Sequence, residues 1–232
     1  MTTTSQPTQV AGTGVSTGSG RRVAAVAGIA SAVLLFLGVF ILNPPLNADN
    51  GELVTWWSDR GNQTTAAVSM YLFAASALCF LGFLAHLSAR LRAADRGGPL
   101  ASLVLANGIV FASALTVAAA ARGVVGKATA LNDQPLPSAD TLRYLMQLAS
   151  VALGVIAMLA ITATIIAVSY AILRTGALGR WLAWVGIVAA FVLLAVQATF
   201  VGELAIPAVL IWTIAVSVAI WRTPALPHGF AH

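Results

Sequence analysis

The sequence predicts an all-α protein that crosses a membrane several times, and three observations support this fold class. Only 8% of the residues are charged and 59% are hydrophobic, with a mean hydropathy of +0.91, whereas about a quarter of the residues of a soluble domain are charged. Apolar runs of about 20 residues, the length that crosses a hydrocarbon core about 30 Å thick, recur six times. The runs are rich in Ala, Val and Leu and do not alternate between polar and apolar residues, which favours helices over barrel strands.

These runs predict six membrane-spanning helices separated by short polar segments. Their predicted bounds are 23–42, 66–87, 100–121, 145–173, 181–200 and 204–221. The fourth helix is the longest, about 43 Å at 1.5 Å per residue, so we expect it to tilt or to project from the membrane. Residues 201–203 alone separate the last two helices, and Pro207 falls in the first turn of the sixth, where a missing N–H leaves no helical bond unmade.

The predicted transmembrane domain, residues 23–222, lies between two cytoplasmic tails. Residues 1–22 are rich in Thr, Ser and Gly without apolar periodicity, which predicts a disordered tail, and residues 223–232 form the second tail. Arg21 and Arg22 before an apolar run are also typical of a signal peptide. That run is longer than the roughly 7 to 15 apolar residues of a signal, and no A-x-A site follows it, so we expect an uncleaved first helix.

The distribution of charge predicts that both termini lie in the cytoplasm, an N-in/C-in topology. With this orientation, eight of the 12 basic residues fall on the cytoplasmic side, in agreement with the positive-inside rule, and Asp95 is the only acid there. Trp181, Trp184 and Trp221 fall at the predicted inner helix ends, as in an aromatic belt. The eight basic residues are Arg21, Arg22, Arg90, Arg92, Arg96, Arg174, Arg180 and Arg222.

Trp56 and Trp57 lie side by side between the first two predicted spans, in the stretch GELVTWWSDRGNQTT. If this stretch is helical, both indoles lie on its apolar side, and Glu52, Asp59 and Arg60 stay in the headgroup layer. We interpret the segment as an interfacial lid anchored by tryptophan. A gate or a ligand-binding surface is the alternative interpretation.

Arg122 is the centre of a predicted polar cluster at the outer membrane boundary. It continues a stripe of alanines at four-residue spacing, so it faces the side of its helix that can approach a neighbour closely. Glu203, Asp140 and Asp133 are the acids within reach. We expect a pair between Arg122 and Glu203, joined by Arg143, and the alternatives are a salt bridge that only fastens helix ends or an arginine that snorkels to the headgroups.

Inside the predicted spans, the polar residues are mainly Asn107, Gln197, Trp212 and scattered Ser and Thr. Asn107 is expected to hydrogen-bond to a neighbouring helix. No Asp, Glu, Lys or Arg falls inside these spans, although ion-coupled transporters and intramembrane hydrolases commonly need such groups there.

The sequence contains no pattern of a catalytic, cofactor or metal site. Cys79 is the only cysteine, which excludes an intramolecular disulfide and a thiolate metal cluster, and the histidines lack metal-ligand spacing. A net charge of +5 would fit nucleic acid only on a soluble fold with a basic face, whereas these basic residues lie at helix ends. We therefore expect no catalytic residue, cofactor, metal or nucleic-acid partner.

Four stretches resemble a family of bacterial integral membrane proteins that is common in actinobacteria and classed as a domain of unknown function. The resemblance covers nearly all of residues 23–222 and implies the membrane fold. No catalytic or binding residue comes with it. The stretches that carry it are SDRGNQTTAAVSMYL, LRAADRGGPLASLVLANG, ILRTGALGRWLAWVGIVAAFVLLAVQ and PAVLIWTIAVSVAIWR.

These observations predict a non-enzymatic multi-pass protein of the bacterial inner membrane, structural or accessory in type. The alternative is a binder or transporter of an apolar or lipid-like small molecule that enters beneath Trp56 and Trp57, and a cavity lined by Asn107, Thr162 and Trp212 would favour it. An intramembrane enzyme would need the ionisable residues around Arg122. The expected partners are the lipid bilayer and either an apolar ligand or another membrane protein.

Overall fold

A computed structural model describes residues 17–45, 48–95, 99–176, 178–198 and 205–222, and in these ranges the chain is helical without any strand. The all-α fold class is therefore confirmed. Two of the elements, η1 and η2, are π-helical, with wider turns than an α-helix. The elements are α1 (Thr17–Phe40), α2 (Asn50–Ser58), α3 (Arg60–Ala94), α4 (Leu100–Gly126), η1 (Lys127–Leu131), α5 (Ala139–Val151), η2 (Ala152–Ala157), α6 (Met158–Thr175), α7 (Arg180–Gln197) and α8 (Ile206–Arg222).

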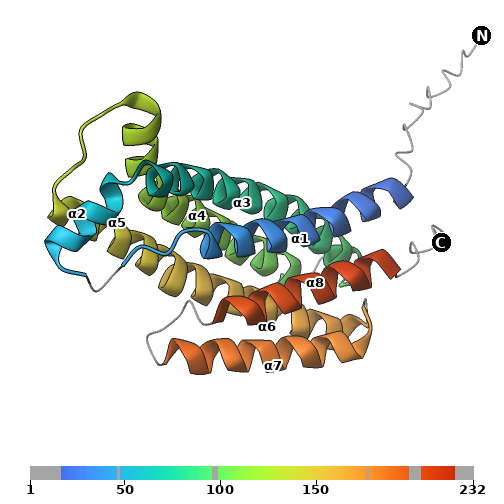
Figure 1. Cartoon of the computed structure of the whole chain (residues 1–232). Helices are drawn as coiled ribbons and strands as arrows, with labels where there is room; N and C mark the ends of the chain where they lie inside the picture. The colour runs from blue at the N-terminus through green and yellow to red at the C-terminus, as the bar shows by residue number, and fades with distance from the viewer. Residues whose placement is uncertain (1–16, 46–47, 96–98, 177, 199–204, 223–232) are drawn as a thin grey trace, which may run out of the picture.

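Five helices of the described chain are long and apolar enough to cross a membrane, and α8, with 17 residues, is a shorter sixth. They pack side by side in one bundle (Figure 1). α5, η2 and α6 form one continuous helical run of 37 residues, Ala139–Thr175, which contains the long fourth span that the sequence predicts. This is the architecture of a multi-pass membrane protein.

The first two spans begin earlier than the sequence predicts. α1 starts at Thr17, so residues 17–22 of the predicted N-terminal tail are its first turns. Residues 1–16 and the predicted second tail, 223–232, lie outside the described residues. α3 starts at Arg60, six residues before the predicted bound, because Asp59 caps it there and the polar residues that follow tolerate a helix outside lipid.

One end of the bundle contains the start of α1 and the end of α8. At the opposite end, the helices stop at different heights (Figure 1). α3 has 35 residues and measures about 52 Å, whereas α7 has 18 residues and measures about 27 Å. As a result α2, the first turns of α3, η1 and the start of α5 project beyond α7 and α8. We call this projecting part the cap domain.

The cap domain has a small apolar core of its own. Asp49 and Asp59 accept hydrogen bonds from the backbone N–H groups of Glu52 and Asn62, at 2.8 and 3.0 Å, and so cap the starts of α2 and α3. Two of the acids beside the Trp pair therefore have a structural role. The buried core residues are Leu42, Leu53, Trp57, Ala66, Val125, Leu142 and Met146.

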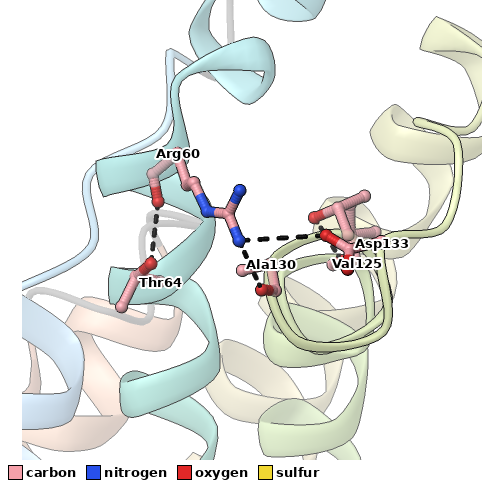
Figure 2. A network of polar contacts seen from close by, with 6 residues as sticks. Arg60, Thr64, Val125, Ala130 and Asp133 are labelled. Atoms are coloured by element: carbon pink, nitrogen blue, oxygen red, sulfur yellow. Dashed lines mark hydrogen bonds and ion pairs between the residues drawn. The ribbon is translucent and has the colours of Figure 1, made fainter.

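A left-handed residue ends η1 and turns the chain toward α5. Asp133 has φ of 48°, a region that Asp enters more readily than most residues. The N–H of Gln134 then donates to the Ala128 carbonyl at 3.0 Å. Figure 2 shows Arg60 reaching this turn from α3, with Nη2 3.4 Å from the Ala130 carbonyl oxygen and 3.8 Å from Asp133 Oδ1. Both charged side chains are exposed, so the pair contributes little to stability.

Serine hydroxyls join α1 to α3 inside the bundle. Ser76 Oγ donates to the Ser31 carbonyl and Ser69 Oγ donates to the Gly38 carbonyl, each at 2.8 Å. The four residues are buried. As the residue number rises along α3 it falls along α1, so the two helices are antiparallel, and hydroxyl bonds of this kind hold helices together in lipid.

Candidate binding pocket beneath the cap domain

A cavity lies where the cap domain joins the bundle, between the end of α1 and the helices α2, α4 and α5. Its volume is about 110 Å³, and on the same measure one water needs about 10–15 Å³. The cavity is therefore large enough for a polar group and a few carbon atoms. Its lining residues are Val39, Leu42, Asn43, Pro44, Trp57, Arg122, Met146, Ala149 and Ser150.

Arg122 is held beside the cavity by contacts with two other helices. Its Nη2 donates to the Leu42 carbonyl at 2.9 Å, and its guanidinium carbon lies 5.5 Å from the centre of the Phe73 ring, within cation–π range. The side chain is half-buried. A guanidinium has five N–H donors in one plane, so it can hold the end of α1 and bind further acceptors at the same time.

Trp57 turns its indole into the protein and not toward lipid. The residue is 2% exposed and packs edge-on against Trp56, with ring centres 5.1 Å apart. Its Nε1–H is buried and has no hydrogen-bond partner in the described structure. Buried indole N–H groups usually find an acceptor, and an unpaired one costs about 1–3 kcal/mol. An acceptor that reached this N–H would remove that cost.

The segment with both tryptophans is helical, and the structure gives its two indoles different surroundings. Trp56 is half-buried at the surface of α2, which suits the predicted interfacial anchor. Trp57 belongs to the core of the cap domain. Trp57, which the sequence predicts to anchor a lid together with Trp56, is therefore the residue of α2 that lines the cavity.

Arg143 donates hydrogen bonds at the start of α2, as Arg122 does just after the end of α1. Its Nη2 donates to the Ala48 carbonyl at 2.9 Å and to Asn50 Oδ1 at 3.0 Å. The two arginines thus bind the two ends of the connection between α1 and α2. Because this connection contributes Asn43 and Pro44 to the cavity, both arginines help to shape the cavity wall.

The predicted outer polar cluster is brought together only in part. Arg122 and Arg143 lie on neighbouring elements, and the contacts described above are to backbone carbonyls and to one amide. Glu203 lies outside the described residues, so its pair with Arg122 stays a prediction. Asp140 is exposed in the first turn of α5, where its charge interacts favourably with the helix dipole.

The predicted intramembrane polar residues lie elsewhere in the bundle. Trp212 is 1% exposed and packs in the main core, and Asn107 is half-buried on α4. Thr162 Oγ1 donates to the Met158 carbonyl of its own helix at 2.7 Å. None of these residues lines the cavity beneath the cap domain.

Sequence reasoning missed the contribution of α5 to the cavity. Met146, Ala149 and Ser150 line it. Leu142, Met146 and Ala149 are buried at spacings of four and three residues, which is the signal of an amphipathic helix. The signal is hard to see because residues 145–173 read as one continuous apolar run, which indicates only a membrane span.

No protein-family model, curated protein or solved structure matches this chain. The resemblance to bacterial membrane proteins of unknown function therefore stays a prediction. Among the described residues, no group of three or more His, Cys, Asp or Glu could hold a metal ion.

Proposed function

We propose that this chain is a non-enzymatic integral membrane protein that binds an amphipathic molecule, with the acidic group of that molecule in the cavity beneath the cap domain. One observation carries the proposal: Trp57, whose buried Nε1–H is unpaired, and Arg122 line the same cavity. Both groups are hydrogen-bond donors, and Arg122 is positively charged. Their natural ligand is a carboxylate, which is an acceptor only.

The remaining lining favours an apolar tail on the same molecule. Val39, Leu42 and Met146 contribute aliphatic surface, which favours methylene groups at about 0.8 kcal/mol for each one buried. A volume of about 110 Å³ holds a carboxylate and the first carbons of a chain. The rest of the tail would lie along the apolar surface of the bundle.

The membrane is proposed to be the cytoplasmic membrane of a bacterium, with both termini in the cytoplasm. The excess of arginine at the end of the bundle where α1 starts and α8 ends supports this orientation. The cavity then lies near the outer surface. An amphipathic molecule would reach it from the outer leaflet or from the periplasm.

Native mass spectrometry of the full chain in a non-ionic detergent tests the proposal. The probes are dodecanoate and dodecylamine, which have the same tail and opposite charge. Dodecanoate should bind as a single adduct and dodecylamine should not. Trp57→Phe removes the N–H and keeps an aromatic ring, so it should weaken dodecanoate binding about fivefold, the equivalent of one hydrogen bond of about 1 kcal/mol.

Trp56→Phe is the matched control, because it changes the neighbouring indole on the same helix and leaves the lining unchanged. It should bind dodecanoate as the natural protein does. Equal binding of the two probes, or equal affinity of both Phe variants and the natural protein, would contradict the proposal. A structural or accessory role without a ligand would then be the better interpretation.

A further inference from the structure

Two arginines lie close together at the end of the bundle opposite the cap domain. Arg21 lies in the first turns of α1 and Arg90 near the end of α3, and both are half-buried. The positive charge of Arg21 is close enough to act on the Arg90 guanidinium. Arg21 therefore adds positive potential at Arg90, which favours an anion beside that guanidinium.

The register of the helix pair explains why the two arginines are near each other. The bonds from Ser76 to Ser31 and from Ser69 to Gly38 define how α1 and α3 align. Continued toward the start of α1, this alignment places Arg21 beside the turn of α3 that ends in Arg90. The packing of α1 on α3 thus places these two turns beside each other.

Arg90 has hydrogen-bond donors that no described protein group satisfies. Its Nε and Nη2 are both buried without a partner. The nearest acid along the chain, Asp95, pairs instead with Arg174 of α6, with 3.7 Å between Oδ1 and Nε. Unpaired charged donors are costly to bury. The remaining described acids lie in the cap domain: Asp49, Glu52, Asp59, Asp133 and Asp140.

We infer that Arg21 and Arg90 form a binding site for a phosphate group at this end of the bundle. A phosphate offers several acceptor oxygens, and a planar guanidinium binds two of them at once. The anion would satisfy the unpaired Arg90 donors, and the positive charge of Arg21 would strengthen its binding. A phospholipid headgroup and a free phosphate ion share this chemistry. The inference is independent of the proposed carboxylate pocket, which lies at the other end of the molecule.

Thermal unfolding of the purified full chain in a non-ionic detergent, followed by tryptophan fluorescence, tests the site. The additions are short-chain phosphatidylglycerol, a diacylglycerol with the same chains, and inorganic phosphate against chloride at equal ionic strength. Phosphatidylglycerol should raise the melting temperature by about 2–4 °C, as binding to the folded state does. The diacylglycerol should not raise it. A rise with inorganic phosphate alone would show that the ion itself is sufficient and would also support the site.

Substitutions separate this site from general attraction between a basic surface and an acidic lipid. Arg90→Gln should abolish the rise, and Arg90→Lys, which keeps the charge and loses the planar donors, should retain less than half of it. Arg92→Gln changes an exposed arginine of the same helix and should leave the rise intact. An undiminished rise in melting temperature in both Arg90 variants would overturn the inference. So would an equal loss of the rise in Arg90→Lys and Arg92→Gln. If Arg90→Gln does not fold, Arg90→Lys alone decides.

Discussion

Arg122 connects three helices through a single side chain, and this explains why a costly charge lies so close to the apolar bundle. It lies on α4, binds a carbonyl at the end of α1 and stacks on an aromatic ring of α3. Without it, the Leu42 carbonyl, just beyond the end of α1, would lose a strong donor near the lipid boundary. Its neighbour in the cavity, Trp57, has the opposite property, because its N–H is covered and unpaired. In the proposed function, Arg122 holds the cavity together and Trp57 makes it selective for an acceptor.

Close helix contacts make individual glycines indispensable, and Gly126 is the clearest example. A Cβ atom at Gly126 would overlap the Gln63 carbonyl oxygen and lie 2.9 Å from the Ala67 nitrogen, both backbone atoms of α3. Backbone cannot move aside as a side chain can. Gly126→Ala should therefore lower the free energy of unfolding by about 1–3 kcal/mol, measured by thermal unfolding in detergent.

Gly82→Ala is the control for this substitution, because nothing lies within 4 Å of a Cβ atom at Gly82. Alanine is a better helix former than glycine, so this change should raise stability by about 0.5–1 kcal/mol. If both variants shifted stability in the same direction by the same amount, helix propensity and not the contact with α3 would be the cause.

At the scale of the helices, backbone carbonyls act as acceptors for side chains from neighbouring elements. Serines of α3 bind carbonyls of α1, arginines bind both ends of the connection between α1 and α2, and Gln197 Nε2 of α7 donates to the Gly154 carbonyl of η2 at 2.9 Å. A π-helical segment leaves carbonyls less regularly bonded than an α-helix does. Gln197 therefore attaches α7 to the long fourth span at the point where that span is least regular.

The bond from Ser76 to α1 predicts a measurable loss when the hydroxyl is removed. Ser76→Ala should destabilise the protein by about 0.6–1 kcal/mol, the usual value of a hydrogen bond between membrane helices. Ser113→Ala is the matched control, since Ser113 is exposed on α4, and it should leave the melting temperature unchanged. A similar loss in both variants would mean that the hydroxyl bond to Ser31 adds nothing measurable.

Helix class and approximate span positions can be predicted from this sequence because lipid imposes them through composition and length alone. The cap domain cannot be predicted in the same way. Its core brings together residues of distant segments, such as Trp57 and Met146, and tryptophan at a membrane boundary is expected to face lipid. Arg122 and Arg143 were predicted as members of an outer polar cluster, whereas the cavity that Arg122 lines and the carbonyl partners of both arginines carry no sequence signal.

The whole molecule is polarised, with arginine-rich helix ends on one side and the acidic cap domain on the other. From this polarity the positive-inside rule predicts a cap domain outside the cytoplasm. Single cysteines in a Cys79→Ala background test this orientation. Asn132→Cys in the cap domain and Ala93→Cys at the end of α3 both introduce exposed positions.

An impermeant thiol reagent applied to intact cells should label the cysteine at position 132 and should reach the cysteine at position 93 only after lysis. Labelling in the reverse order would show that the cap domain faces the cytoplasm. The carboxylate pocket would then collect its ligand from inside the cell, and the arginine pair would face the outer leaflet.

The short helix α7 has a consequence for the surrounding lipid. It measures about 27 Å, less than the roughly 30 Å of an average hydrocarbon core. A bilayer that thins beside α7 would match its length, whereas α3 and α4 are long enough to cross an average bilayer. Lipids with shorter acyl chains should therefore gather along α7, so the protein would tend to move into thinner regions of its membrane.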